Sequence, residues 1–227
     1  MAVRSEFDRY ADEYDATVQA AIGASGETVE FFADLKARLA RAEAPDARRI
    51  LDFGCGVGNL CRALARRFPD AHLAGCDPSS DSINTARART GGGIEYAVND
   101  ERIPFPDASF DLVVAACVFH HIGAGEQERW LREIARVLRP GGRLVFFEHN
   151  PLNPLTRRVV RNVPFDAGVV LLGRGASARL VHSAGLRVSR ARYYFFFPRL
   201  LSAFRVLERL MGWIPLGAQY YVTGVRP

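Results

Sequence analysis

Short apolar runs alternate with stretches of helical spacing through the middle of the chain. The apolar runs lie at residues 49–53, 71–76, 94–98, 110–117 and 143–148, and the helical stretches lie at residues 59–68, 79–89 and 126–138. Strands that alternate with helices form βαβ units, whose crossover helices cover both faces of a parallel sheet. Because such crossovers are right-handed, the sheet becomes doubly wound. The alternation therefore predicts an α/β fold with a mostly parallel sheet.

Segments with other patterns flank this core. Residues 5–42 carry two helical patterns, the first of which contains Phe7, Tyr10 and Tyr14 at i, i+3, i+7 spacing. After residue 150 we expect an Arg- and Pro-rich insertion at 151–164, a helix at 177–184 that Gly185 caps, a strand at 186–197, a helix at 200–211 and an antiparallel last strand at 219–225. We expect residues 1–227 to form one domain, divided into N-terminal helices (1–44), the alternating core (45–149), the insertion and its helix (150–185), and the final strands and helix (186–227).

A glycine-rich segment, Asp52-Phe53-Gly54-Cys55-Gly56-Val57-Gly58-Asn59, leaves the first apolar run and enters a helix. Glycines at alternate positions let the backbone turn tightly and let a ligand approach without a Cβ clash. The dinucleotide fingerprint needs a third glycine three residues after the second, but Gly58 follows Gly56 by only two residues. A carboxylate at Asp52 suits an ammonium or hydroxyl group and repels a pyrophosphate. The segment favours a zwitterionic or cationic ligand over a nicotinamide dinucleotide.

The second apolar run ends at Asp77, followed by Pro78. A carboxylate at this edge of a parallel sheet can accept hydrogen bonds from both hydroxyls of a ribose. Asp77 could instead cap the helix that starts near Ser79. The glycine segment and Asp77 together are more specific than either feature alone.

The chain resembles the class I S-adenosylmethionine-dependent methyltransferases over about residues 7–149. The segment LDFGCGVGNL resembles their first motif, CDPS the acidic end of their second strand, and NDERIPFPDASFD their third-strand region. The segments CVFHHI and REIARVLRPGGRLVFFE resemble the motifs that follow. The resemblance implies a Rossmann-like fold, S-adenosylmethionine as cofactor and an enzyme that transfers its methyl group.

Carried onto this sequence, the resemblance implies a cofactor site along the ends of the strands. Asp52 and the backbone at Gly54–Gly58 would face the methionine moiety, Asp77 the ribose diol, and Asn99 with Asp100 the adenine, and Tyr14 would belong to an N-terminal lid helix. The family's acid for the adenine falls at position 99, so either the amide of Asn99 replaces it or the loop has slipped by one residue. The implied cofactor-binding residues are Tyr14, Asp52, Gly54, Cys55, Gly56, Gly58, Asp77, Pro78, Asn99, Asp100 and Cys117.

Three histidines are candidates for chemistry on the methyl acceptor. A methyl transfer depends mainly on aligning the acceptor, and a general base adds to the rate if the acceptor must lose a proton. His120 and His121 directly follow the fourth strand, where the methyl group should be exposed, and an unperturbed imidazole can act as a base near neutral pH. His149, at the end of the fifth strand, is a further acceptor-site candidate. Each of these histidines could instead have a packing or capping role.

Basic residues concentrate at the end of the chain. Residues 151–227 contain 12 arginines and only two acidic residues, Asp166 and Glu208. Arg157, Arg158 and Arg161 fall on one helical face, where they could bind an acidic group of the acceptor or simply be solvated. We expect the aromatic run 193–197 to be core. The apolar stripe of the helix at 200–211 should cover the sheet, with contact to an anionic membrane as the less favoured alternative.

Several classes of function are disfavoured. The pair Asn150-Pro151 follows the fifth strand and lacks the aromatic residue that nucleobase amino-methyltransferases place after their fourth strand, so no nucleic-acid partner is predicted. The cysteines Cys55, Cys61, Cys76 and Cys117 lack the spacing of a zinc site, which predicts reduced thiols and no metal. With no apolar segment typical of a secretory signal and no run of 18 apolar residues, we expect a cytoplasmic protein.

The sequence thus predicts a methyltransferase that acts on oxygen, nitrogen or carbon of a small, partly apolar acceptor. That acceptor could carry an acidic group, as lipid-linked and natural-product molecules do. A non-catalytic S-adenosylmethionine-binding protein and, less favoured, a nicotinamide-dependent oxidoreductase remain as alternatives. The sequence leaves the oligomeric state open.

Overall fold

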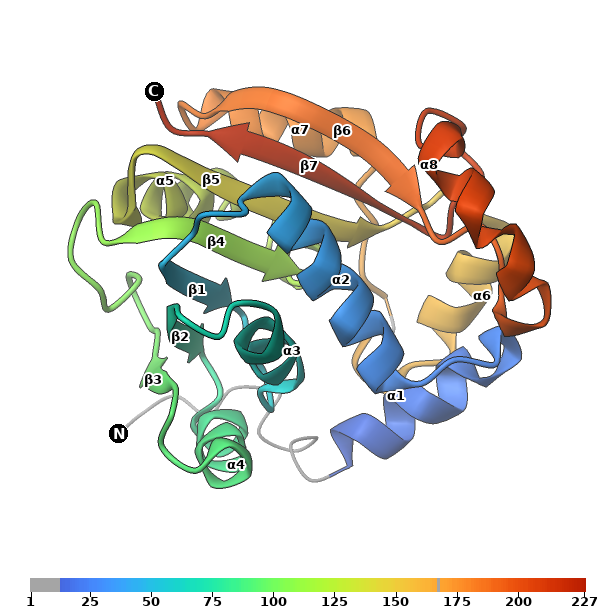
Figure 1. Ribbon diagram of the computed structural model, residues 1–227, viewed down its shortest axis with the longest axis horizontal. Helices are drawn as coiled ribbons and strands as arrows, with labels where there is room; N and C mark the ends of the chain where they lie inside the picture. Colours follow the sequence, from blue (N-terminus) through green and yellow to red (C-terminus); the bar gives the residue numbers. More distant parts are fainter. Residues whose placement is uncertain (1–12, 167) are drawn as a thin grey trace.

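The computed structural model describes residues 13–166 and 168–227, in which seven strands form one sheet (Figure 1). The strand order is β3-β2-β1-β4-β5-β7-β6. The strands are β1 (Arg49–Phe53), β2 (His72–Asp77), β3 (Glu95–Val98), β4 (Phe110–Ala116), β5 (Leu138–His149), β6 (Arg187–Tyr194) and β7 (Gln219–Val225). The helices are α1 (Tyr14–Ile22), α2 (Val29–Glu43), α3 (Asn59–Arg67), α4 (Ser80–Thr90), α5 (Gln127–Val137), α6 (Pro154–Arg161), α7 (Arg174–Ser183) and α8 (Glu208–Met211), with 3-10 turns η2 (Gly23–Ser25), η3 (Phe119–His121), η4 (Pro164–Asp166) and η5 (Arg199–Leu207).

The pairing of the strands confirms the predicted sheet. β1 pairs in parallel with β2 and β4, and the parallel set extends to β3 on one side and β5 on the other. β7 runs antiparallel between β5 and β6. Since the chain winds outward in opposite directions from β1 and β4, their carboxyl ends flank the topological switch point at which such folds bind ligands.

Helices cover both faces of the sheet, so its central strands are buried on both sides. Along β1, Ile50 packs with α2 and α3, whereas the next residue, Leu51, packs with α5 and α7 on the other face. Both side chains are fully buried. This is why the strands read as continuous apolar runs in the sequence rather than as an alternating pattern.

The N-terminal helices are present where the structure describes them. Phe7 and Tyr10, which belong to the first predicted helical pattern, lie outside the described residues. The insertion predicted at 151–164 contains α6, whose N-terminus is capped by the Asn153 side chain accepting from the backbone amides of Leu155 and Thr156. No helix among the described residues is long and apolar enough to span a membrane.

The expectation that residues 200–211 cover the sheet is wrong. The segment forms η5 and α8 rather than one α-helix, with non-helical dihedral angles at Leu201, and none of its side chains is buried. The faces of the sheet are already covered by α2, α3, α5 and α7. The segment therefore lies beyond the carboxyl ends of the parallel strands (Figure 1).

The strand predicted at 186–197 is shorter than expected. It ends at Tyr194 because Phe195 adopts a left-handed conformation, with φ of 57°, that turns the chain away from the sheet. Tyr193, Tyr194 and Phe195 are buried, as predicted, whereas Phe196 and Phe197 are only partly buried, and β6 is an edge strand. The amides of Phe196 and Phe197, which leave the ladder here, donate instead to the carboxylate of Glu208.

Candidate active site

The loop after β1 holds its shape through two glycines with different surroundings. Gly54 has φ of 73°, and a Cβ atom there would lie 2.4 Å from a methyl group of Val118. Gly56 has φ of 50°, and nothing lies within 4 Å of the place that its Cβ would occupy. Gly54 is therefore required by packing, whereas Gly56 borders open space that a ligand can fill.

Asp52, at the end of β1, is a buried carboxylate with little to neutralise it. Its side chain is 1% exposed and accepts a hydrogen bond of 3.2 Å from the Cys61 thiol. Burial raises the pKa of Asp52 to about 7, although the hydrogen bond from Cys61 opposes the rise. A cationic group beside Asp52 would favour its ionised form, which fits a ligand that carries an ammonium group.

Asp77, at the end of β2, ties the glycine loop to the next helix. Its two carboxylate oxygens accept hydrogen bonds of 2.9 Å from the backbone amides of Gly56 and Ser79. Ser79, not Asp77, caps α4, because its hydroxyl accepts from the amide of Ser82. As the last residue of β2, Asp77 lies at the carboxyl edge of the sheet. The neighbouring Pro78 is exposed.

After β3, the two candidates for the adenine position separate. The side chain of Asn99 is buried and its Oδ1 atom has no hydrogen-bond partner among the described residues. Asp100 is exposed. A buried carbonyl oxygen without a donor is unfavourable, so Asn99 is the residue of the two that is suited to accept a hydrogen bond from a ligand.

Two residues at the start of helix α1, Tyr14 and Asp15, contact other segments of the chain. The ring of Tyr14 stacks on Phe165 with centroids 5.3 Å apart. Asp15 accepts a 2.5 Å hydrogen bond from Asn59 and pairs with Arg89 at 2.8 Å. These contacts join α1 to the segment after α6 and to α3 and α4, which supports its interpretation as a lid.

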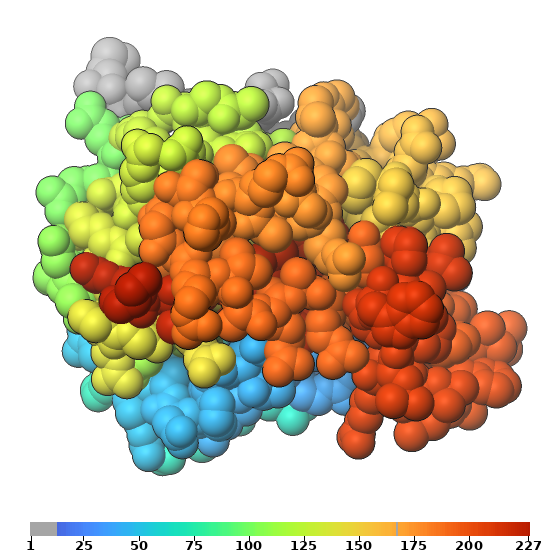
Figure 2. All heavy atoms as spheres, turned by 90° about the horizontal axis from the view of Figure 1, so that it is seen from above, coloured from blue at the N-terminus to red at the C-terminus, as the bar shows by residue number. Residues whose placement is uncertain are grey.

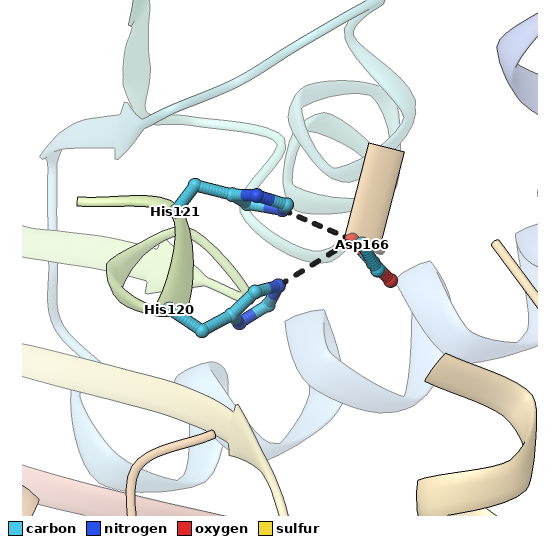
Figure 3. Close-up of side chains that lie close together, drawn as sticks. All are labelled: His120, His121 and Asp166. Atoms are coloured by element: carbon cyan, nitrogen blue, oxygen red, sulfur yellow. Dashed lines mark ion pairs between the residues drawn. The ribbon is translucent and has the colours of Figure 1, made fainter. Parts of the chain in front are cut away.

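A cluster of histidines and carboxylates lies at the ends of β4 and β5, and Figure 3 shows three of its members. His120 and His121 come from η3, directly after β4, and both rings point toward Asp166 on η4. The Nε2 atom of His121 lies 3.1 Å from Asp166 Oδ1, and the Nε2 atom of His120 lies 3.7 Å from the same oxygen. On its other side, His120 Nδ1 lies 2.6 Å from Glu148 Oε2.

Glu148 is fixed by the backbone as well as by His120. It is 1% exposed, and its Oε1 atom accepts from the backbone amides of Phe119 and His120 at 2.9 and 3.3 Å. This arrangement orients the His120 ring, since one of its nitrogens must donate to Glu148. The ring of His149 lies with its centroid 5.4 Å from that of His120.

The charges of the cluster follow from these contacts. Burial lowers the pKa of His120, but the charge of Glu148 and hydrogen bonds with Asp166 and Glu148 outweigh burial and raise it well above its ordinary value. Burial alone would raise the pKa values of Glu148 and Asp166. Their charge interactions and hydrogen bonds with the histidines outweigh burial, so both pKa values are lowered. Burial and the charge on His120 lower the pKa of His149 to about 4. His120 is therefore a buried imidazolium at neutral pH, whereas His149 is neutral.

Cys117 directly follows β4 and precedes η3. Its φ of 59° turns the chain sharply after β4, and its backbone amide donates to the carbonyl of Phe147. Burial raises the pKa of the thiol, which therefore stays protonated at neutral pH. The four cysteines are unpaired thiols.

The same cluster offers donor atoms for a metal ion. Ligand atoms of His120, His121 and Asp166 lie within 4.8 Å of one another, a spacing that could hold a divalent cation. Without a cation the cluster is also satisfied, because the His120 ring, protonated on both nitrogens, lies between the carboxylates of Glu148 and Asp166. That the protein binds no metal therefore stays a prediction from the sequence.

The structure brings some of the predicted residues together and leaves others apart. The loop after β1, Asp77, Asn99, Cys117 and the three histidines share the carboxyl edge of the sheet. Arg157, Arg158 and Arg161 are exposed on α6 and make no ion pair among the described residues.

Sequence reasoning missed Glu148 and Asp166 as members of the cluster. Asp166 was visible as one of only two acidic residues after position 150, and Glu148 as the acid that ends a buried strand. Neither signal indicates a histidine partner.

Comparisons with known proteins agree with this architecture. The methyltransferase-domain family matches residues 50–142, which run from β1 into β5. Demethylmenaquinone methyltransferase of Thermus thermophilus is 32% identical over 191 residues, covering 80% of this chain and 80% of the relative. Trans-aconitate 2-methyltransferase of Mycobacterium marinum is 31% identical over 173 residues, 69% of this chain. This chain spans 65% of the length of that relative and 53% of a fatty-acid O-methyltransferase of Mycolicibacterium smegmatis.

A solved structure extends the likeness of the fold to nearly the whole chain. A possible histamine N-methyltransferase of Thermotoga maritima superposes with a TM-score of 0.71 at 20% identity, covering 97% of this chain and 98% of that one. The family match, the similar relatives and the shared fold lead to one assignment. The chain belongs to the class I S-adenosylmethionine-dependent methyltransferases.

Proposed function

We propose that this protein transfers the methyl group of S-adenosylmethionine to a small, partly apolar acceptor, and that the reacting group is a hydroxyl. The observation that carries the proposal is the pair of the partly exposed His121 with the buried Asp166, with Nε2 and Oδ1 3.1 Å apart, next to the charged pair His120–Glu148. A histidine held by a carboxylate is suited to take a proton from an acceptor during the reaction. A nitrogen or carbon acceptor that loses a proton would use the same base.

The residues at the strand ends fit the cofactor. The open space at Gly56 can admit a ligand, Asn99 Oδ1 lacks a donor that an adenine amino group would supply, and Asp52 suits an ammonium group. Asp77 would hold the ribose diol, and Tyr14 on α1 would close over the methionyl end. When bound, S-adenosylmethionine supplies an electrophilic methyl group and a good leaving group, so the protein's main task is to align the acceptor.

The two histidines of η3 have different roles in this proposal. His121 accepts the proton of the acceptor, and Asp166 stabilises the imidazolium that forms. His120 is already an imidazolium, which disqualifies it as a base, and its charge balances that of Glu148 beside the His121–Asp166 pair. A positioned base contributes about 10²–10⁴-fold to the rate.

The charges and the relatives narrow the acceptor class. Two carboxylates face one imidazolium in the cluster, so a neutral hydroxyl is favoured over a carboxylate at the reacting position. An acidic group elsewhere on the acceptor would have to lie on the side of α6, near Arg157, Arg158 and Arg161. The names of the relatives, which act on trans-aconitate, fatty acids and demethylmenaquinone, agree with a small acceptor that has acidic or apolar character.

The test measures transfer of a labelled methyl group to a reduced naphthoquinone, which offers hydroxyls, and to an unsaturated tricarboxylate and a long-chain fatty acid, which offer only carboxylates. Transfer to the carboxylates alone would contradict a hydroxyl as the reacting group. Turnover of the best acceptor should fall about 10²–10⁴-fold in His121→Ala, while the affinity for S-adenosylhomocysteine stays unchanged. His182→Ala is the matched control, because His182 is exposed on α7. Wild-type turnover by His121→Ala would exclude His121 as the base.

The test also addresses the non-catalytic alternative. A protein that binds S-adenosylhomocysteine but labels no acceptor in this panel would support a binding role rather than an enzyme. A protein that binds neither form of the cofactor would overturn the proposal altogether.

A further inference from the structure

One end of the molecule exposes an unusual amount of apolar surface. Of the 12 large hydrophobic side chains that are exposed among the described residues, all but Val98 lie between Leu152 and Leu216. η5 and α8 contain no buried residue, and Leu200 is 93% exposed. A helical segment in which every leucine is at least 41% exposed is unusual in a globular domain and indicates a surface that another phase or molecule covers.

These side chains belong to one continuous surface. The side-chain amide of Asn153 donates to the carbonyl of Leu216 at 2.7 Å, and the hydroxyl of Thr156 donates to the carbonyl of Ala218, so α6 is joined to the segment after α8. Figure 1 shows α6 at the same end of the molecule as α8, and Figure 2 shows the red segment around residues 199–216 projecting at that end. We call the exposed side chains of residues 152–161 and 199–216 the apolar–basic face.

The charge of this face has one sign. Arg157, Arg158 and Arg161 on α6, and Arg199 and Arg209 on η5 and α8, are exposed and form no ion pair among residues 13–166 and 168–227. The one acidic residue of the face, Glu208, is turned inward to accept from the amides of Phe196 and Phe197. The face therefore combines aliphatic side chains with uncompensated arginines.

We infer that the apolar–basic face docks on the surface of an anionic lipid bilayer. Leu200, Phe204 and Leu210 enter the boundary between headgroups and acyl chains, and the arginines contact lipid phosphates. Trp213, which is 73% exposed, lies where tryptophan prefers to be, at the interface between water and membrane. A second copy of the chain is a poorer partner, because a two-fold contact of this face would bring its arginines together.

Docking would bring the bilayer next to the acceptor site. Within the chain, α6 lies between β5, which ends at His149, and η4, which carries Asp166, so short connections join the face to the histidine cluster. An acceptor with a long apolar part could then reach the site from the lipid phase. Entry of the acceptor from the lipid phase rests on the proposed function. The docking itself does not, because vesicle binding is measured without turnover.

The experiment compares binding of the full chain to vesicles of phosphatidylcholine alone and to vesicles containing 40% phosphatidylglycerol. We expect cosedimentation only with the anionic vesicles, weakened by 0.5 M salt, and a blue shift of tryptophan fluorescence that Trp213→Phe abolishes. Leu200→Gln/Leu210→Gln should abolish binding, and each arginine removed should weaken it about fivefold. The double variant Arg199→Glu/Arg209→Glu should lose binding. Its control is Arg38→Glu/Arg66→Glu, which changes the net charge by the same amount at exposed positions on α2 and α3, outside the apolar–basic face, and should lose less.

Three results would overturn the inference. The first is absence of binding to the anionic vesicles at low salt. The second is equal loss of binding in the two charge-reversal variants, which would indicate unspecific attraction. The third is a wild-type dimer in light scattering that Leu200→Gln/Leu210→Gln converts to a monomer, which would assign the face to self-association. Circular dichroism of each variant checks that it remains folded.

Discussion

Replacing Glu148 by Gln tests whether the buried histidine cluster carries charge. The substitution keeps the size of the side chain and removes the negative charge 2.6 Å from His120 Nδ1. Removing one partner of a buried ion pair typically costs about 3–5 kcal/mol. We expect about 3 kcal/mol, the lower end, because His120 keeps Asp166 at 3.7 Å and can release its proton.

The pH dependence gives the prediction its sign. The pKa of His120 is raised, so its contribution to stability is complete below its unfolded value of 6.5 and is lost as the pH rises through the folded value. The pKa of Glu148 is lowered, so its contribution is complete above its unfolded value of 4.5 and is lost as the pH falls through the folded value. The difference in the free energy of unfolding between wild type and Glu148→Gln should therefore be largest between pH 4.5 and pH 6.5, the two unfolded pKa values. The difference should become smaller at lower and at higher pH.

Urea denaturation followed by circular dichroism at several pH values measures this difference. The slope of the free energy of unfolding against urea concentration should be the same for both proteins, which indicates that they unfold alike. Asp34→Asn is the matched control. It removes the partner of Arg67 in an exposed pair and should cost only about 0–1 kcal/mol. A loss in Glu148→Gln below about 1 kcal/mol, or a loss that does not vary with pH, would refute the assignment of a buried imidazolium–carboxylate pair.

Three further predictions concern the ligand edge of the sheet. Gly54→Ala should destabilise the protein by about 2–4 kcal/mol in urea denaturation, because of its positive φ and the contact with Val118. Gly56→Ala should cost only about 1–2 kcal/mol yet weaken S-adenosylhomocysteine binding at least about tenfold in calorimetry; equal effects of the two variants on stability would contradict this assignment of roles. Asp15→Ala, which removes the contacts of α1 with Asn59 and Arg89, should speed dissociation of S-adenosylhomocysteine in stopped-flow measurements, and an unchanged rate would argue against α1 as a lid. Dialysis against EDTA should leave methyl transfer unchanged and elemental analysis should find well under one metal ion per chain, because a proton on His120 already satisfies the cluster; loss of activity restored by a divalent cation would reverse that view.

Local signals predicted the fold and the cofactor edge. The apolar run ending at Asp52 and the glycines after it have to form a buried strand and a tight turn, whatever the rest of the chain does. Asp77 follows at the end of the next strand, and parallel strands bring such ends together at one edge. The choice between Asn99 and Asp100 could not be made from the sequence, because it depends on which of the two side chains the loop buries.

The sequence by itself determined the parallel sheet, its ligand edge and the two histidines after β4, because these depend on spacing along the chain. Only the tertiary structure decided that Asp166, from a segment 45 residues after His121, completes the cluster, since no periodicity relates the two positions. Only the structure also decided that the apolar stripe at 200–211 faces outward. A helical pattern records that one side is apolar, but what covers that side depends on whether the sheet still has a free face, and here α2, α3, α5 and α7 already occupy both.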